Sequence, residues 1–371
     1  MWTTDESKPV SEADQSFLTL HEIVKAAYRK ADRNIWDYIV GGTETETTVR
    51  RNRLAIDRIA FRPRVLRDVS KLDASGRFFD HPIRLPVVLA PVGGLESIGH
   101  EGEVQVARVA SRFGVPFFLS SVTKIPLETV AAAASGPKVF QLYVRGDDAF
   151  VDDHVRRARD AGYDALCLTV DTAIYSRRER DIAKRFAKPW RERAGGMEFQ
   201  AALNWNHVKR FRDKHDVPLI LKGIATAEDA ALACEHGVTA VYVSNHGGRQ
   251  LDHGRGALDF LPEIVAAVAG RARIIVDGGF CRGSDIVKAV ALGADLVGIG
   301  RLYCYGLAAA GEDGVARVLE LLEAEIFACL GLLGAAGFAD LDGSYVCPAE
   351  PVATPHVLSA FPLIDIPDGG Y

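Results

Sequence analysis

The sequence predicts an α/β protein: a (β/α)8 TIM barrel with an N-terminal helical segment and an extended loop after the fourth strand. Eight short apolar runs rich in β-branched residues follow one another from residue 86 onward. Segments with helical periodicity or long loops separate these runs, as expected for a barrel of alternating strands and helices. Near-continuous apolar runs are typical of parallel strands buried on both faces. An open, doubly wound sheet is the alternative that the spacing alone leaves open.

The elements are expected in a regular order. Two helical segments come first, at residues 18–30 and around Ile35, Trp36 and Tyr38, and Gly41-Gly42 closes the second. The expected strands are residues 86–92, 115–121, 138–144, 165–171, 218–224, 240–246, 273–279 and 296–301. The expected helices between them are residues 102–113, 148–161, 227–236, 258–269 and 284–291.

Three segments lie outside this pattern. Residues 1–16 are expected to be a flexible arm, and residues 17–371 a single cofactor-binding domain. The polar stretch 172–217 is long enough to be an active-site loop or lid. The Pro-rich tail 348–371 is expected to pack over the surface or against a neighbouring subunit.

Composition excludes several classes of protein. The 371 residues are 48% hydrophobic and 25% charged, which is typical of a globular chain. A net charge of −5 argues against a nucleic-acid-coating protein. No apolar run reaches the ~20 residues that cross a bilayer, and residues 1–16 lack the features of a signal peptide. The six cysteines lie far apart, so we expect no disulfide framework, no metal site and a cytoplasmic location.

Polar residues gather where the expected strands end. They are Ser120, Ser121, Gln141, Tyr143, Thr169, Asp171, Lys222, Asn245, His246, Asp277 and Arg301. The carboxyl ends of barrel strands meet at one rim, so these side chains are expected to converge there on an active site.

The segment SNHGGRQLD at 244–252 is the most informative cluster. His246 ends the sixth strand, and two glycines let the chain turn tightly before Arg249. A base followed by a fixed cation suits a substrate that carries an anion beside an abstractable proton. The alternative is structural, with His246 capping a strand and Arg249 paired with Asp252.

Other charged residues extend this site. Lys222 follows three apolar residues and needs a partner or a developing anion if it is buried. Arg178 opens the long loop, where a solvated surface position is an equal alternative. The segments DGG at 277–279 and GIGR at 298–301 are typical of a phosphate site after strands 7 and 8.

These motifs have a family resemblance. SNHGGRQLD, TVDT, QLYV, LKGI, DGG and GIGR, in this order and spacing, resemble the FMN-dependent L-2-hydroxy acid oxidases and dehydrogenases of the glycolate oxidase, lactate oxidase and mandelate dehydrogenase type. The likeness runs from about residue 18 to 341 and includes DYIVGGTETETTVRRN and FRPRVLRDVS.

The resemblance implies an FMN cofactor and a role for each matching residue. His246 would be the base and Asp171 would hold its imidazolium, while Lys222 would lie near the N1–C2 carbonyl edge of the flavin. Arg178 and Arg249 would bind the substrate carboxylate, and Tyr38 and Tyr143 would hydrogen-bond the substrate. The implied cofactor-binding residues are Pro91, Val92, Gly93, Ser120, Gln141, Thr169, Lys222, Ser244, Asp277, Gly278, Gly279, Arg282, Gly300 and Arg301.

The sequence departs from the family pattern at four places. Ile39 replaces a tyrosine, and Cys281 stands where an arginine is usual, with Arg282 following. Val122 replaces the usual aromatic residue, and Gly93-Gly94 follows the first strand. The last two changes predict a larger pocket and a substrate bulkier than glycolate.

The implied reaction is oxidation of a 2-hydroxy acid, with oxygen as acceptor and hydrogen peroxide as product. A quinone or protein acceptor, and a bulkier peptide or biosynthetic intermediate as substrate, are the alternatives. A barrel of the inosinate dehydrogenase type is disfavoured, because it needs a nucleophilic cysteine where this chain has His246 to Arg249. The family also implies a homo-oligomer, most simply a tetramer.

Overall fold

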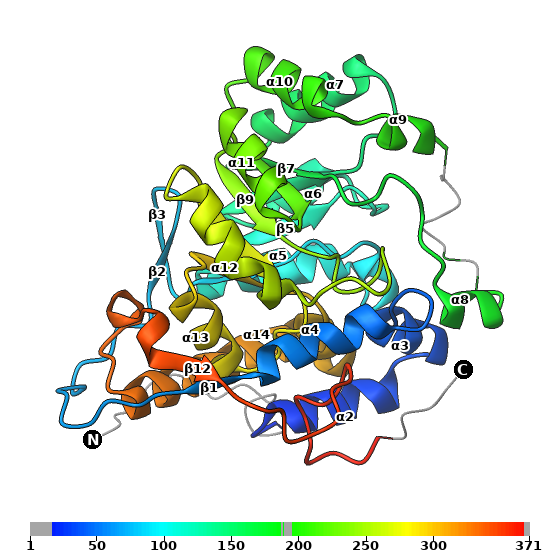
Figure 1. The fold of residues 1–371 in the computed structure, drawn as a ribbon. Coiled ribbons are helices and arrows are strands. Elements are labelled where there is room, and N and C mark those ends of the chain that lie inside the picture. Colours follow the sequence, from blue (N-terminus) through cyan, green and yellow to red (C-terminus); the bar gives the residue numbers. More distant parts are fainter. Residues whose placement is uncertain (1–16, 187, 189–194, 367–371) are drawn as a thin grey trace.

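A closed barrel of eight parallel strands forms the centre of the molecule (Figure 1). The computed structural model describes residues 17–186, 188 and 195–366. The barrel strands are β4 (Val87–Leu89), β5 (Phe117–Ser120), β6 (Lys138–Leu142), β7 (Ala165–Thr169), β8 (Leu219–Ile224), β9 (Ala240–Val243), β10 (Arg273–Asp277) and β11 (Leu296–Ile299). Because β11 pairs in parallel with β4, the sheet has no edge, and the predicted TIM barrel is confirmed over the open-sheet alternative.

Side chains fill the barrel interior. Phe118, Tyr242 and Ile275 pack there with smaller aliphatic residues, and each of the three is fully buried. A short antiparallel hairpin, β2 (Gly76–Phe78) and β3 (His81–Ile83), adds Phe78 and Ile83 to this inner cluster. The barrel is therefore a packed core, and the site must lie at its rim.

Helices alternate with the strands. The five expected helices are present as α5 (Gly102–Phe113), α7 (Asp148–Asp160), α11 (Ala227–Glu235), α12 (Ala257–Val268) and α13 (Gly283–Ala291). Three helices that the periodicity did not predict are α6 (Leu127–Ala132), α10 (Trp205–Lys214) and α14 (Arg301–Leu333). Non-helical backbone at Ala310 and Gly311 divides α14 into two parts.

Three N-terminal helices lie beside the barrel (Figure 1). They are α2 (Leu20–Lys30), α3 (Arg33–Val40) and α4 (Thr47–Asp57). Helix α2 packs against α14, and Phe361 from the C-terminal segment covers both through His21 and Tyr305. Strand β12 (Val346–Pro348) pairs with β1 (Ile59–Phe61), so the start of the predicted tail also packs on the surface. The expected arm, residues 1–16, lies outside the described residues.

The long insertion after β7 carries two short helices, α8 (Glu179–Ala183) and α9 (Met197–Ala201). Gln200 fixes α9 to the barrel rim and is only 2% exposed. Its Oε1 accepts from the backbone N of Val144 at 2.7 Å, and its Nε2 donates to the carbonyl of Thr169 at 2.8 Å. One buried amide thus joins the ends of β6 and β7 and holds Met197 over the rim.

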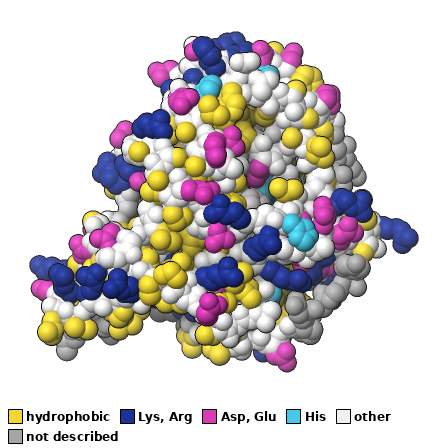
Figure 2. Space-filling model, viewed as in Figure 1, with side chains coloured by type: hydrophobic (Ala, Val, Ile, Leu, Met, Phe, Trp, Pro, Cys, Tyr) yellow, Lys and Arg dark blue, Asp and Glu magenta, His cyan; other side chains and the backbone are white. Residues whose placement is uncertain are grey.

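The surface carries both signs of charge. Acidic and basic side chains are interspersed over most of the face shown in Figure 2. Among the described residues, no helix is both long and apolar enough to cross a membrane. The same residues contain no cluster of three or more His, Cys, Asp or Glu suited to a metal ion.

A buried pair of carboxyl groups lies between the first two strand–helix loops. Glu103, near the start of α5, is 1% exposed, and within the described structure neither of its carboxyl oxygens has a hydrogen-bond partner. Glu96 faces it from the 3-10 turn η1 (Leu95–Ser97). Burial, reinforced by the side-chain contact with Glu96 and by its charge, raises the pKa of Glu103 to about 8. Glu103 therefore keeps its proton in the folded protein at neutral pH.

This pair predicts how stability changes with pH. The unfolded chain releases the Glu103 proton near pH 4.5 and the folded chain near pH 8, so the free energy of unfolding should fall as pH rises between these values. Glu103→Gln removes the titration and should stabilise the protein at pH 9 by about 1–3 kcal/mol, the usual cost of an uncompensated buried polar group. At pH 5 the variant and the parent should be similar. Calorimetric Tm values at pH 5, 7 and 9, with exposed Glu235→Gln as control, test this; parallel Tm–pH curves for parent and Glu103→Gln would contradict it.

Candidate active site

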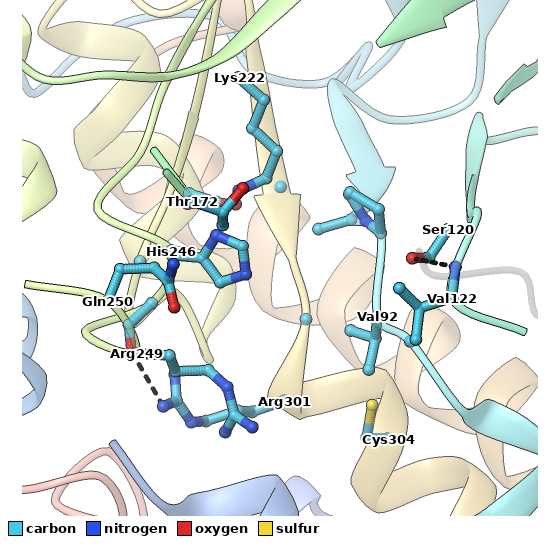
Figure 3. A pocket seen from close by; sticks show the side chains of 18 of the residues that line it. Val92, Ser120, Val122, Thr172, Lys222, His246, Arg249, Gln250, Arg301 and Cys304 are labelled. Atoms are coloured by element: carbon cyan, nitrogen blue, oxygen red, sulfur yellow. Dashed lines mark hydrogen bonds and ion pairs between the residues drawn. The ribbon is translucent and has the colours of Figure 1, made fainter. Parts of the chain in front are cut away.

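A cavity of about 540 Å³ opens at the carboxyl ends of the barrel strands. Most of the predicted site residues line it. They are Tyr38, Pro91, Val92, Gly93, Ser120, Tyr143, Arg178, Lys222, His246, Arg249, Asp277, Gly278, Gly279, Gly300 and Arg301. In Figure 3, His246, Arg249 and Arg301 lie on one side of the open space, and Val92 and Val122 lie on the other.

His246 sits on a left-handed turn. The φ angles of His246, Gly247 and Gly248 are 59°, 62° and 75°, a backbone conformation that glycine adopts freely and other residues rarely do. The backbone N of His246 donates to Oγ of Ser244 at 3.0 Å, which holds the turn. The two glycines therefore allow the chain to reverse directly after the sixth strand and project the imidazole into the cavity.

Asp171 and Tyr143 determine the state of the imidazole. Nδ1 of His246 lies 3.0 Å from Oδ1 of Asp171, so it carries the proton that this carboxylate accepts. Nε2, with its lone pair, lies 3.3 Å from the hydroxyl of Tyr143. Burial lowers the pKa of His246, and the charge of Asp171 offsets this only in part. His246 is therefore a neutral imidazole at pH 7 with its basic nitrogen toward the cavity.

Asp171 itself does not line the cavity but supports His246 from behind. Its close approach needs Gly223 in β8, because a Cβ at that position would lie 2.6 Å from the Cβ of Asp171. Burial opposes ionisation of Asp171, yet the contact with His246 and the charge of Lys222 bring its pKa below the ordinary value.

Arg178 and Arg249 are two of the guanidinium groups that line the cavity without a carboxylate partner in the described structure. Arg178, at the start of α8, lies 5.1 Å from the ring centre of Tyr175, and its buried Nε has no hydrogen-bond partner there. Arg249 lies 4.8 Å from the ring centre of Tyr38. Burial and repulsion from Arg178 lower the pKa of Arg249 to about 10. The structural alternative for Arg249 is wrong, because Asp252 instead accepts from the backbone N atoms of Thr45 and Thr48.

The C-terminus of α3 holds the cavity arginines in place. Nη1 of Arg249 donates to the carbonyls of Tyr38 and Gly41 at 2.6 and 2.9 Å. Arg301 donates to the carbonyls of Ile39 and Gly41 at 3.1 and 3.0 Å. The last carbonyls of a helix lack intrahelical partners and favour cations. The N-terminal helical segment therefore orients both arginines without neutralising them.

Tyr38 has a second contact across the cavity. Its hydroxyl donates to the carbonyl of Gly93 at 2.8 Å. Burial raises the pKa of both Tyr38 and Tyr143, so both remain protonated donors at neutral pH.

Lys222 belongs to a buried polar network. Its Nζ donates to Oγ of Ser244 at 2.8 Å and lies 3.3 Å from Asp277. Burial alone would lower the pKa of Lys222, but Asp277 and Asp171 more than offset it. Ser244 also donates to Asp277 at 2.6 Å. The Ser244 hydroxyl, which also accepts from the backbone N of His246, positions Lys222 and His246, and the contact of Ser244 with the cofactor stays a prediction.

The cavity also has features of an anion site. Gly279, Gly300 and Arg301 line it, and α14 begins at Arg301, so a helix N-terminus lies at the cavity. Arg53 from α4 also lines it, and its Nη1 donates to the carbonyl of Gly279 at 3.3 Å. Asp57 and Asp285 pair with Arg53, which leaves Arg301 as the cation here that only carbonyls hold.

One predicted cofactor contact is corrected. Arg282 does not line the cavity; Cys281 takes the lining position before it. The Arg282 guanidinium points toward α14, where it pairs with Glu325, and it donates to the carbonyl of Ala360 at 3.3 Å. Successive residues point in different directions, so an arginine one position later in the sequence does not replace the missing one.

Two further predicted residues provide a test of whether FMN fits. Gln141 and Thr169 are 1% and 0% exposed and lie beside residues that line the cavity, Ser120 and Lys222. Both amide atoms of Gln141 and Oγ1 of Thr169 are buried without a hydrogen-bond partner in the described structure. Buried polar groups are normally paired, so these donors and acceptors suit a polar ring system in the cavity. The guanidinium of Arg301, which follows the glycine that precedes α14, suits a phosphate.

Val122 shapes the part of the cavity that lies beside Gly93. A Cβ built at Gly93 would lie 2.9 Å from the Cβ of Val122, so the valine packs directly against the glycine. Part of the space that Gly93 leaves is thus filled, and the predicted enlargement rests on valine replacing an aromatic residue.

Comparisons with known proteins agree with this geometry. A family model described as FMN-dependent dehydrogenase matches residues 27–348. The chain belongs to this family.

Its similarity to individual family members extends over most of both chains. An L-lactate oxidase of Nostoc sp. is 37% identical over 362 residues, covering 90% of this chain and 99% of that protein. Glycolate oxidase 1 of Oryza sativa subsp. indica is 39% identical over 343 residues, covering 86% and 93%. A crystal structure of mandelate oxidase is 38% identical with a TM-score of 0.84, covering 91% and 100%.

Membership of the FMN-dependent dehydrogenase family confirms the resemblance inferred from the motifs and makes this chain an FMN-dependent oxidoreductase. A mandelate oxidase variant with an FMN adduct, 38% identical with a TM-score of 0.82, shows the cofactor in a close structural neighbour.

Four functional positions escaped prediction from the sequence. Arg53 and Arg145 line the cavity, Gln200 fixes the insertion, and Glu103 is the buried acid of the rim. Arg145 follows Tyr143 by two residues, a spacing that marks the same side of an extended chain and could have identified it. Arg53 and Gln200 act through contacts distant in sequence and carry no comparable local signal.

The unpaired amide of Gln141 predicts that removing it stabilises the apoprotein but weakens FMN binding. Gln141→Met keeps the length and removes both orphan polar atoms. The apoprotein should be stabilised by about 1 kcal/mol, while FMN should bind roughly 2- to 10-fold more weakly because a hydrogen bond is lost. Tm of the apoprotein and fluorescence titration with FMN measure the two effects. Gln105→Met, outside the cavity, should leave FMN affinity unchanged; an unchanged affinity in Gln141→Met would show that the amide does not contact the flavin.

Proposed function

We propose that this chain oxidises an L-2-hydroxy acid to the 2-oxo acid with FMN, using His246 as the base. One observation carries the proposal: a neutral imidazole backed by Asp171 and the two guanidinium groups of Arg178 and Arg249 open on the same cavity. A carboxylate and an adjacent hydroxyl-bearing carbon present the two chemical groups that this arrangement can bind.

The arginines bind the carboxylate. Arg178 and Arg249 repel each other, and an anion between them removes that repulsion. Planar guanidinium groups match a carboxylate in geometry, so binding fixes orientation as well as position. The neutral hydroxyls of Tyr38 and Tyr143 line the same cavity, and that of Tyr38 exchanges its contact with the Gly93 carbonyl for one with the substrate.

The base removes a proton while the cofactor takes electrons. FMN, when bound, would supply the redox chemistry: it would accept the two electrons and the second of the two hydrogens that the carbinol loses as it becomes a carbonyl. Nε2 of His246 takes one proton of the substrate, and the Tyr143 hydroxyl that lies 3.3 Å from Nε2 exchanges that contact for one with the substrate. Asp171 accepts from Nδ1 throughout and stabilises the imidazolium that forms.

The base predicts a specific pH profile. Because the pKa of His246 lies below its ordinary value of 6.5, kcat/KM should rise with pH through an inflection under 6.5 and be flat at neutral pH. His246→Asn should lower kcat by roughly 10²- to 10⁴-fold, whereas exposed His100→Asn should leave it unchanged. Asp171→Asn removes the charge that raises the pKa of His246, so the inflection should move to lower pH. Anaerobic flavin reduction from pH 5 to 9 measures all four proteins; full activity in His246→Asn would refute the assigned base.

We infer that oxygen is the electron acceptor and hydrogen peroxide the product, which the names of the lactate oxidase and glycolate oxidase relatives support. A quinone or protein acceptor is the alternative. Peroxide formation and dye reduction, measured in one assay with the same substrate, distinguish them. Peroxide in an amount equal to the oxo acid formed identifies an oxidase.

The preferred substrate should be bulkier than glycolate. Val122 leaves more room than an aromatic residue, and the similar mandelate oxidase is named for an aromatic substrate. Turnover of glycolate, lactate, mandelate and longer L-2-hydroxy acids tests this, and glycolate as the best substrate would contradict it. The tetramer and the cytoplasmic location stay predictions; light scattering measures the first.

A further inference from the structure

Among the described residues, the cavity contains one more cation without a carboxylate partner than the proposed reaction and its cofactor use. Its cationic lining residues are Arg53, Arg145, Arg178, Lys222, Arg249 and Arg301. Arg53 and Lys222 are paired with aspartates. A cofactor phosphate accounts for Arg301, and the substrate carboxylate accounts for Arg178 and Arg249. Arg145 has no assigned anion.

Within the described residues, Arg145 has no carboxylate that neutralises it. It is half-buried at the rim after β6, and in the described structure it makes no ion pair with a carboxylate. Its Nη1 contacts the Sδ of Met197, and a thioether is only a weak acceptor. Burial lowers the pKa of Arg145, with Tyr143 and Glu198 opposing it. A guanidinium in this setting gains from a carboxylate ligand.

The position of Arg145 relates it to the reacting end. Tyr143, whose hydroxyl approaches His246, lies two residues earlier, which corresponds to roughly 7 Å along an extended chain. The α9 segment packs closely here, because a Cβ at Gly196 would lie 2.3 Å from the carbonyl oxygen of Arg145. Gln200 anchors that segment to both neighbouring strands. Arg145 is therefore part of a fixed wall.

Several residues that share the cavity with Arg145 are apolar. Phe150 from α7, Met197 from α9 and Val122 after β5 line the same cavity. His154, whose ring contacts Phe150 and whose Nδ1 bonds the Phe150 carbonyl at 2.8 Å, also lines it. Such a wall suits a short carbon chain that ends at a cation.

We propose that Arg145 binds a second acidic group at the far end of the substrate. The preferred substrates are then L-2-hydroxy dicarboxylates, in which Arg178 and Arg249 hold the carboxylate beside the hydroxyl and Arg145 holds the distal one. The assignment rests on the proposed function, because it takes the first carboxylate site as given.

Substrates matched in length test this. Wild-type holoenzyme should show kcat/KM roughly 10- to 100-fold higher for L-2-hydroxyglutarate than for L-2-hydroxypentanoate, the range that a charge-assisted contact provides. Arg145→Gln should remove most of this preference by raising KM for the diacid, with little change for the neutral acid. Exposed Arg29→Gln is the matched control. Arg145→Glu should reverse the preference toward a 2-hydroxy acid with a terminal ammonium group.

A binding measurement gives an independent readout. Glutarate, which has no hydroxyl to oxidise, should perturb the flavin absorbance of the wild type at concentrations roughly 10-fold lower than those needed for Arg145→Gln. FMN content and Tm of each variant report folding.

The outcomes distinguish a failure of the proposed function from a failure of the role assigned to Arg145. If neither acid reduces the flavin, and neither do lactate or mandelate, the proposed function fails. If the wild type reduces its flavin equally well with both acids, or prefers the neutral one, Arg145 does not bind a distal anion and the function stands. The wild-type comparison decides this even where a variant fails to fold.

Discussion

The hydroxyl of Ser244 is the point on which the geometry of the site depends. It accepts from Nζ of Lys222 at 2.8 Å and from the backbone N of His246 at 3.0 Å, and it donates to Asp277 at 2.6 Å. A serine hydroxyl has one proton and two lone pairs, so its capacity is full. Three neighbouring strands, β8, β9 and β10, are thereby joined at their carboxyl ends. The left-handed backbone of His246 is held by this network rather than by its own preference.

Glycines in the barrel strands make room for this network, and the packed barrel interior holds it in place. Gly223 lets Asp171 approach the end of β8, and at Gly298 in β11 a Cβ would lie 2.2 Å from the hydroxyl oxygen of Tyr242. In both places the missing side chain admits a polar group beneath the cavity floor. The packed interior below these groups cannot shift to relieve a misplaced one, so a closed parallel barrel positions them more strictly than a loop would.

Periodicity predicted the barrel because buried parallel strands must be apolar, and the order of the strands then placed the polar residues of their ends at one rim. His246 and Lys222 were predictable for this reason, since they lie at or near the carboxyl ends of β9 and β8, and Arg249 follows His246 after the Gly-Gly turn. Arg282 was not, because the direction of a side chain beyond a strand end depends on the local turn; here it faces Glu325. The role of Gln200 was equally hidden, because its partners at Val144 and Thr169 are 56 and 31 residues away in sequence.

The electrostatics of the cavity explain why the N-terminal helices are part of the site. The whole chain has a net charge of −5, yet Arg178 and Arg249 line the cavity with no carboxylate partner in the described structure. A carboxylate partner would position a guanidinium, but it would also neutralise its charge. The terminal carbonyls of α3 position Arg249 and Arg301 through dipoles alone, so the full charge stays available to a ligand. The energetic cost of this arrangement appears at Arg249. Burial and the charge of Arg178 lower its pKa to about 10. An anion that binds here meets donors that are already oriented. Its binding regains the free energy that the protein loses by burying arginine charges without a carboxylate partner.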